Sequence, residues 1–366
     1  MLTELRAAKI LIIHQGAVGD FILALPTLSA LRESLQPTCT EIMAQPWNLP
    51  LVDGRFCADQ VSDVNRADMA PFFQEEAALP KSMSCHLRTF DAALVFGRSQ
   101  ILARNLRRAG IQHVYLLPPF PRGRIHLTDH HLSSVASLGI PTHPAAPTIY
   151  LKNEDMNWAE AFLRNMRCDP DSGRGILALH PGAGSRKKAW PAHRFAAVAR
   201  MLTRDDMQSL IIEGPADEQL VLDTLRDLNG LEPVILRHLS LVQLGAILKH
   251  CSLYIGNDSG VSHLAAAVGI PTIAIFGPTD PVVWAPRGER ASWLRGKVSC
   301  SPCNLARRQQ CTRQRCLEAT TVEDLIPLLA EIQISHEPIV VSGGCTTSSW
   351  TSCHIGINHS ETCIMH

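Results

Sequence analysis

Residues 254–281 read YIGNDSGVSHLAAAVGIPTIAIFGPTDP and decide how the chain is organised. An apolar run ends in the polar turn 256–260, residues 261–268 have helical spacing, and a second apolar run follows at 272–276. This order predicts a strand, a turn, a short helix and a strand. Open α/β sheets bind anionic ligands at such turns, because backbone N–H groups and the helix dipole converge there.

Asp258 and His263 flank this turn. Taken singly, Asp258 or Ser259 is equally consistent with a helix N-cap, and His263 with an ordinary surface histidine. A second polar turn, at residues 277–280, follows the next apolar run and would lie at the same edge of the sheet. The two turns together favour a ligand site.

The composition predicts a folded protein of two domains. The chain has 366 residues, more than a single core usually supports, and its 46% hydrophobic and 19% charged residues provide for buried sheets. Lys plus Arg and Asp plus Glu both number 34, so no overall charge favours nucleic acid, and anion binding must depend on local patches. The apolar run before His14 is too short for a signal peptide or a membrane span. We therefore expect a cytoplasmic protein.

The first domain is expected to span residues 1–165. Residues 9–14 predict a strand and 20–34 a helix, joined by a turn in which Gly16 and Gly19 allow close backbone approach. This turn is not G-x-G-x-x-G, so it does not predict a dinucleotide site. Asp20 starts the helix and either faces the ligand or only caps the helix.

Residues 40–150 alternate apolar runs, such as 92–96 and 114–117, with helical segments, as expected for a doubly wound domain. The basic stretch 122–126 is either part of an anion-binding wall or a solvated loop. A Pro-, Gly- and Ser-containing segment at 168–173 predicts the domain junction.

The second domain is expected to span residues 172–334 and to repeat the strand-turn-helix pattern. A predicted strand at 175–180 leads into PGAGSRKKAWP at 181–191, where glycine amides and three cations favour a phosphate cradle with Lys188 as a point charge. A surface basic run is the alternative, and the order is not that of a Walker A loop. An acidic turn at 214–218 follows the next predicted strand. The three loops should share one sheet edge, facing a cleft between the domains.

Nine of the twelve cysteines fall into two groups. Four lie close together as Cys300-x2-Cys303-x7-Cys311-x4-Cys316, a spacing that favours a metal site over disulfides in a reducing compartment, with four free thiols on a loop as the alternative. Five isolated ones are expected to be buried small apolar residues: Cys39, Cys57, Cys85, Cys168 and Cys251.

Several ordered motifs resemble glycosyltransferase family 9, the ADP-heptose:lipopolysaccharide heptosyltransferases, over about residues 8–325. They are GAVGD at 16–20 with Pro26, HPGA at 180–183 with K-x-W-P at 188–191, GNDSG-x2-H at 256–263, and FGPT at 276–279. The resemblance implies a GT-B architecture, in which two facing Rossmann-like doubly wound domains enclose a cleft. It also implies a metal-independent, inverting transfer that needs no cofactor.

Matching the motifs residue by residue implies that Asp20 is the general base. Glu218, or else Glu213, is implied at the nucleoside. The matching also implies Lys188, Asp258 and His263 at the donor. The backbone amides of Gly182, Ser185, Ser259 and Gly260 are expected to bind the donor as well, because they could offset the charge on a leaving diphosphate.

Similar cysteines occur in part of this family, and in relatives that modify proteins they resemble a metal-binding finger. The resemblance thus implies a structural zinc or iron ion at Cys300, Cys303, Cys311 and Cys316. We expect this segment to lie away from the three loops, in a structural or oligomer-forming role. Beyond it, residues 335–366 are polar and aperiodic and predict a disordered tail, with a second metal patch or a reading-frame artefact as alternatives.

The leading hypothesis is an enzyme that transfers heptose from ADP-heptose to a hydroxyl of the lipopolysaccharide inner core, or of its lipid A precursor. It would work at the cytoplasmic face of the inner membrane, without nucleic acid. One alternative is a heptosyltransferase with a protein Ser or Thr acceptor. Another is a non-catalytic nucleotide-sugar-binding protein.

Overall fold

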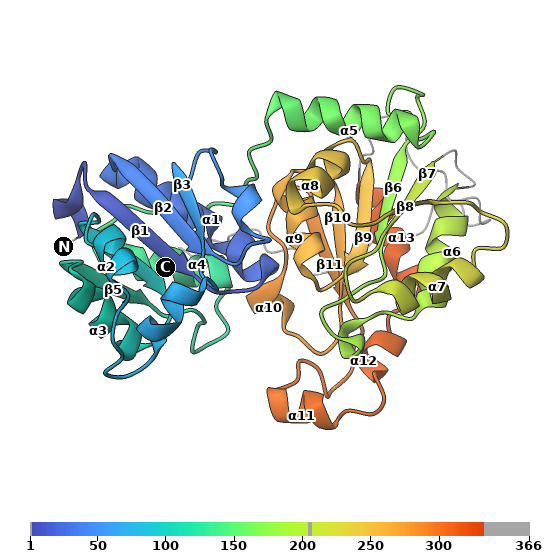
Figure 1. The fold of residues 1–366 in the computed structure, drawn as a ribbon. Coiled ribbons are helices and arrows are strands. Elements are labelled where there is room, and N and C mark those ends of the chain that lie inside the picture. Colours follow the sequence, from blue (N-terminus) through green and yellow to red (C-terminus); the bar gives the residue numbers. More distant parts are fainter. Residues whose placement is uncertain (1, 204–206, 333–366) are drawn as a thin grey trace, which may run out of the picture.

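The computed structural model describes residues 2–203 and 207–332. They form two α/β halves that lie side by side, each built on one sheet of parallel strands (Figure 1). The strands of the first sheet are β1 (Lys9–His14), β2 (Cys39–Ala44), β3 (Gln60–Asp63), β4 (Ala92–Phe96) and β5 (His113–Leu117). Those of the second are β6 (Ile176–His180), β7 (Gln208–Ile212), β8 (Val234–Leu236), β9 (Leu253–Asn257), β10 (Thr272–Phe276) and β11 (Ala291–Arg295).

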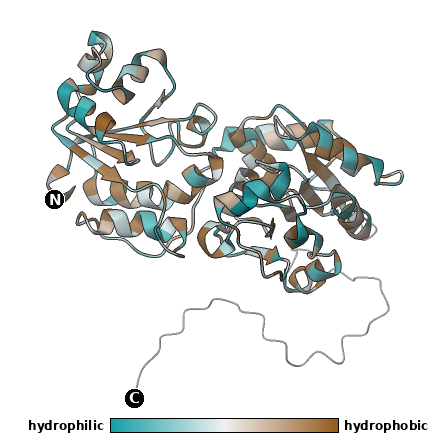
Figure 2. Ribbon diagram, turned by 90° about the horizontal axis from the view of Figure 1, so that it is seen from below, coloured by the Kyte–Doolittle hydropathy of each residue, from teal (hydrophilic) through white to brown (hydrophobic). Residues whose placement is uncertain are grey.

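The strand orders are β3-β2-β1-β4-β5 and β11-β10-β9-β6-β7-β8, with every neighbouring pair parallel. Parallel strands covered by helices on both faces read as apolar runs, as Ile176–His180 and Leu253–Asn257 do here. Figure 2 shows hydrophobic residues along the strands and mixed residues along the helices. The predicted α/β class with two doubly wound sheets is confirmed.

Most of the helices pack against these sheets. In the first half they are η1 (Leu2–Leu5), α1 (Val18–Leu35), η2 (Leu49–Leu51), η3 (Ala67–Phe73), α2 (Lys81–Leu87), α3 (Gln100–Ala109) and α4 (Leu127–Ala136). The others are α5 (Asn153–Asn165), η4 (Arg186–Lys188), α6 (Ala192–Thr203), α7 (Glu218–Arg226), α8 (Leu241–Lys249), α9 (Gly260–Ala267), α10 (Pro281–Trp284), α11 (Leu305–Gln310), α12 (Arg315–Glu318), η5 (Glu323–Leu325) and α13 (Ile326–Glu331).

Helix α1 begins at Val18, two residues before the predicted start. The reason is one half of a capping box, in which the Asp20 carboxylate accepts a hydrogen bond from the N–H of Ala17 at 3.3 Å. Asp20 therefore occupies the first turn of the helix rather than its cap. The helix also contains Pro26 and buries its apolar residues against the first sheet.

Helix α5 belongs with the second sheet. It packs on α8, and just before it the N–H of Ile149 donates to the carbonyl of Ala267 at 3.1 Å. In Figure 1 this green helix lies over the half that contains β6 to β11. The junction was expected at residues 168–173, which follow α5. The chain instead crosses from the first half to the second before α5.

Three of the five isolated cysteines are buried, namely Cys57, Cys168 and Cys251. The prediction is wrong for the other two. Cys39 is partly exposed at the first residue of β2, and Cys85 is exposed on α2, whose buried positions are Met83 and Leu87. The expected tail at 335–366 lies outside the described residues. Within the described part of the chain, no helix is both long enough and apolar enough to cross a bilayer.

Candidate active site

The loop after β6 is fastened to the end of β9 by the side chain of Asn257. Its amide nitrogen donates to the carbonyls of Pro181 and Gly182 at 2.9 and 3.1 Å, and its oxygen accepts from the N–H of Trp190 at 2.8 Å. Asn257 is fully buried. The predicted phosphate cradle therefore lies beside the polar turn that follows β9, at the carboxyl edge of the second sheet.

Lys188 and Asp258 form an ion pair at this edge. The Lys188 Nζ lies 2.7 Å from Asp258 Oδ2, which also accepts a hydrogen bond from the Thr279 hydroxyl at 2.5 Å. The Asp258 side chain is only 6% exposed, and that of Lys188 is 20% exposed. The three predicted turns of this region, at 181–191, 256–260 and 277–280, thus meet at one point.

Asp20 approaches this pair from the other half of the molecule. Burial raises the pKa of Asp20, and the nearby Asp258 carboxylate raises it further, while the N–H of Ala17 and the charge of Lys188 act in the opposite direction. A raised pKa makes this carboxylate a stronger base than an ordinary aspartate. The residue predicted as the base and the residues predicted at the donor are therefore electrostatically coupled.

The starts of α1 and α9 pack closely against each other and so fix how the two halves sit beside the site. A Cβ at Gly19 would lie 2.8 Å from Cδ2 of His263, and a Cβ at Gly260 would lie 2.6 Å from Cβ of Val18. Only glycine fits at either position without movement. Burial lowers the pKa of His263 to about 4, so the imidazole is neutral at neutral pH, and its Nδ1 is buried without a partner among the described residues.

We expect the acid limb of the pH profile to report Asp20. Because the base must be ionised, kcat/KM should fall as pH drops through the raised pKa of Asp20, with a midpoint above the ordinary value of about 3.9. Lys188 lowers this pKa, so Lys188→Met should move the midpoint to higher pH. Initial rates across the pH range give the midpoint for the unmodified protein and for the variant. An acid midpoint that Lys188→Met does not shift would contradict the assignment of this limb to Asp20.

A buried histidine–aspartate pair, which was not predicted, lies beside the site. His180 Nε2 lies 3.1 Å from Asp217 Oδ2, and His180 Nδ1 lies 3.2 Å from the Ser259 hydroxyl. Asp217 also accepts a hydrogen bond from the N–H of Gly214 at 3.0 Å. A Cβ at Gly182 would lie 2.0 Å from the Asp217 carboxylate, so the glycine of the cradle makes room for it. The signal was present, because the acidic turn contains Asp217 beside the residue that was chosen.

Glu218, which was predicted at the nucleoside, has no contact with Lys188 or Asp258 in the described structure. It is exposed as the first residue of α7, and the alternative, Glu213, pairs with Arg237 at 2.8 Å. Ser185 is exposed at the N-cap of η4, where its hydroxyl accepts from the N–H of Lys187 at 3.3 Å. The donor-binding roles of these residues stay predictions.

The four clustered cysteines do not form a metal-binding group in this arrangement. Among the described residues, no set of three or more His, Cys, Asp or Glu side chains is placed to hold an ion. Cys303 Sγ donates to the carbonyl of Cys300 at 3.1 Å, Cys311 Sγ donates to the carbonyl of Arg313 at 3.0 Å, and Cys316 is buried on α12. Two of the four thiols thus donate to backbone carbonyls, and a structural zinc or iron ion at this segment stays a prediction.

The cysteine segment also lies closer to the loops than expected. The Ser301 hydroxyl donates to the carbonyl of Gly277 at 2.6 Å, and the N–H of Cys303 donates to that of Pro278 at 2.7 Å. Lys187 Nζ donates to the carbonyl of Arg308 at 3.0 Å. The expectation that this segment lies away from the loops is wrong, because it supports the turn at 277–280 from behind.

Ion pairs join the halves beside the site. Arg124 Nε lies 2.6 Å from Asp280 Oδ2, and Arg287 pairs with Asp129 on α4. His126 Nε2 lies 2.9 Å from the carbonyl of Ala285. Residues 122–125 are exposed, as expected for a solvated loop, but the Arg124 side chain is paired with Asp280 and His126 is buried against the second half.

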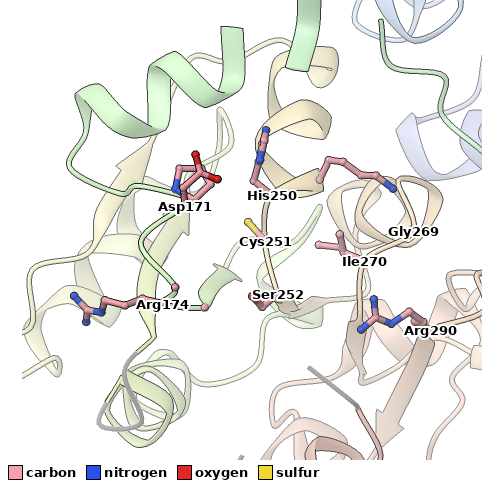
Figure 3. Close-up of a pocket in the computed structure, with 12 residues that line it drawn as sticks. Asp171, Arg174, His250, Cys251, Ser252, Gly269, Ile270 and Arg290 are labelled. Carbon is pink, nitrogen blue, oxygen red and sulfur yellow. The ribbon is translucent and has the colours of Figure 1, made fainter. Parts of the chain in front are cut away.

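A separate cavity of about 550 Å³ lies at the opposite edge of the second sheet (Figure 3). It opens next to Gly175, Ser252 and Ile270, which come just before β6, β9 and β10. Ligands of open α/β sheets bind at the carboxyl ends of strands, and this cavity is at the amino ends. It is therefore distinct from the site at Lys188 and Asp258.

A family model described as glycosyltransferase family 9 (heptosyltransferase) matches residues 121–314. The chain belongs to glycosyltransferase family 9. It is 23% identical over 290 residues to lipopolysaccharide heptosyltransferase 3 of Escherichia coli K12, covering 73% of this chain and 82% of the relative.

Solved structures of the family have the same fold. The family 9 glycosyl transferase from Veillonella parvula superposes with a TM-score of 0.75 at 18% identity, covering 90% of this chain and 98% of that one. The E. coli heptosyltransferase WaaC with ADP gives a TM-score of 0.62 at 16% identity, covering 88% and 99%. The predicted family and GT-B fold are confirmed, and the chain is a glycosyltransferase related to heptosyltransferases of the lipopolysaccharide core.

Proposed function

We propose that this glycosyltransferase moves heptose from ADP-heptose to a hydroxyl of the lipopolysaccharide core with inversion at the anomeric carbon. The observation that carries the proposal is the meeting of Asp20 with the Lys188–Asp258 pair across the two halves. One side supplies a base and the other a cation for a diphosphate. A displacement with inversion needs these two groups on opposite faces of the sugar.

The proposed reaction is a single displacement. The acceptor hydroxyl gives its proton to the Asp20 carboxylate as its oxygen bonds to the anomeric carbon. The bond from that carbon to the diphosphate oxygen breaks, and its electron pair leaves with the nucleotide. The transition state resembles an oxocarbenium ion, and negative charge grows on the departing diphosphate.

Lys188 would stabilise this growing charge together with backbone N–H groups at Gly182, Ser185 and Gly260. Fixed donors aimed at developing charge are among the strongest catalytic effects. In this proposal they serve in the role that a divalent ion has in metal-dependent transferases. The choice of ADP-heptose and of a lipopolysaccharide acceptor rests on the relatives, which are lipopolysaccharide heptosyltransferases, one of them solved with ADP. Work at the cytoplasmic face of the inner membrane is part of this proposal.

The experiment that tests the proposal is a donor and acceptor screen. The protein is incubated with ADP-heptose, or separately with UDP- and GDP-sugars, in the presence of EDTA, and nucleotide release is followed with a heptose-deficient lipopolysaccharide or a Ser/Thr peptide as acceptor. We expect release only with ADP-heptose and lipopolysaccharide, and NMR of the product should show an inverted linkage. Transfer to the peptide would indicate a protein acceptor. If none of the nucleotide sugars releases its nucleotide, the chain is a binding protein.

A further inference from the structure

The turn that leads to Asp20 is hydrogen-bonded to a buried histidine at the end of β1. The N–H of Gly16 donates to His14 Nδ1 at 3.2 Å, and His14 is only 4% exposed. A ring nitrogen that accepts a hydrogen bond carries no hydrogen, so a neutral ring has its hydrogen on Nε2. One nitrogen of this imidazole is thus committed to the backbone of the turn.

The surroundings of the His14 ring keep it neutral and in place. Burial and the nearby His131 lower the pKa of His14 to about 3, while a hydrogen bond to its own backbone acts in the opposite direction. The ring packs against Phe21 of α1 and Phe96 of β4, with centroid distances of 5.2 and 5.1 Å. His14 Nδ1 therefore remains an acceptor at neutral pH.

Gly16 lies between this ring and the side chain of Asp20. A Cβ at Gly16 would lie 2.6 Å from Cε1 of His14 and 2.9 Å from Cβ of Asp20. Only glycine lets the ring and the side chain approach the backbone so closely. The imidazole therefore supports Asp20 through the backbone of Gly16.

Two successive peptide groups of this turn are held by side chains. In the first, the carbonyl of Gln15 accepts from Gln45 Nε2 at 3.3 Å, and the N–H of Gly16 donates to His14. Each end of this peptide group thus has a side-chain partner, which fixes its orientation.

The next peptide group joins Gly16 to Ala17. Its carbonyl accepts from Nδ2 of the fully buried Asn48 at 3.2 Å, and its N–H donates to Asp20 Oδ2 at 3.3 Å. The orientation of this group decides whether the N–H of Ala17 meets the carboxylate. It follows directly on the group that His14 holds.

We propose that His14 is a positioning residue for the base Asp20. By accepting the hydrogen bond from Gly16, its Nδ1 would fix the turn so that the N–H of Ala17 meets the carboxylate. The carboxylate is then held at the site instead of rotating freely. This role rests on the proposed function of Asp20.

Two variants separate the accepting atom from the bulk of the ring. His14→Asn places an amide oxygen near the position of Nδ1 and can still accept from Gly16, whereas His14→Leu is of similar size and cannot. We expect His14→Leu to lower kcat about tenfold, roughly the worth of one hydrogen bond, and His14→Asn to stay within about threefold of the unmodified protein. The dissociation constant of ADP should be unchanged in both, because the proposed diphosphate loops lie on the other half.

A second readout is the pKa of Asp20. The N–H of Ala17 lowers this pKa, so its loss in His14→Leu should raise it and move the acid midpoint of kcat/KM to higher pH. Lys188 and Asp258, whose charges also face Asp20, are the same in both proteins. Carbon-13 NMR of the Asp20 carboxyl in the ligand-free protein, assigned with Asp20→Asn, should show the same upward shift. That measurement needs no turnover, so it stands or falls separately from the proposed function.

His131→Leu is the matched control. His131 is also buried, and its ring lies 5.0 Å from that of Phe96, but its Nε2 bonds the carbonyl of Pro119 at 3.1 Å rather than the turn. This variant should lose stability without a change in kcat or in the acid midpoint. Normal kcat and midpoint in His14→Leu, or equal losses in His14→Leu and His14→Asn, would overturn the proposal.

Thermal melts show which variants fold. If His14→Leu does not, nitrogen-15 NMR of the unmodified protein at neutral pH decides, with His14→Asn to assign the ring signals. A coupling from the Gly16 amide to a bare Nδ1 supports the proposal, and an Nδ1 that carries a hydrogen overturns it.

Discussion

Replacing Asp20 by Asn should lower kcat by about two to four orders of magnitude, the usual contribution of a general base. Asn keeps the size of the side chain and an oxygen that accepts the hydrogen bond from Ala17, so α1 should still begin at Val18. Only proton acceptance is lost. Initial rates of ADP release with saturating donor and acceptor measure the effect.

The control for Asp20→Asn is donor binding. Asp20 lies on the half opposite the proposed diphosphate loops, and removing its charge relieves repulsion of an anion. The dissociation constant of ADP should therefore stay the same or fall slightly. A variant that turns over at the normal rate, or one that loses ADP binding together with turnover, would show that Asp20 is not the base.

Replacing Lys188 by Ala should lower kcat by about two to three orders of magnitude, as loss of a charge-stabilising donor does in other enzymes. The change also leaves Asp258, which is almost fully buried, without its partner at 2.7 Å. The uncompensated carboxylate would then face the departing diphosphate. Both kcat and the ADP dissociation constant should be measured, and both should worsen.

Lys187→Ala is the matched control. It removes the same charge one residue away, but Lys187 Nζ bonds the carbonyls of Arg308 and Gln309 on α11 instead of the site. Its kcat should stay within a few-fold of the unmodified protein. Similar losses in both variants would mean that the general positive charge of this loop matters, rather than the placement of Lys188.

Much of the second sheet followed from local pattern. The apolar run at 272–276 forms β10 with the predicted limits, and the segment of helical spacing at 261–268 forms α9, shifted by one residue. These segments are predictable because burial on both faces demands continuous apolar residues, and helical burial demands a 3.6-residue period. The convergence of Lys188 and Asp258 followed from topology, since loops after parallel strands share an edge.

The features that were not predicted depend on contacts between segments that are far apart in the sequence. Helix α5 reads as amphipathic, but nothing in its own sequence says which sheet it covers. Asp217 and Glu218 are neighbours of the same type, and only the packing of Gly182 against Asp217 decides which one is buried. The cysteine segment follows the second sheet in sequence, yet it folds back onto Gly277 and Pro278.

Under the proposed function, the ion pair between Lys188 and Asp258 has a consequence for product release. A diphosphate that enters the site competes with a carboxylate already bound to the lysine, so binding exchanges one ionic partner for another. The free energy gained is the difference between the two pairings, not the full attraction of a free cation. When the spent nucleotide departs, Asp258 is in place to receive the lysine again, which favours rapid turnover over tight retention of product.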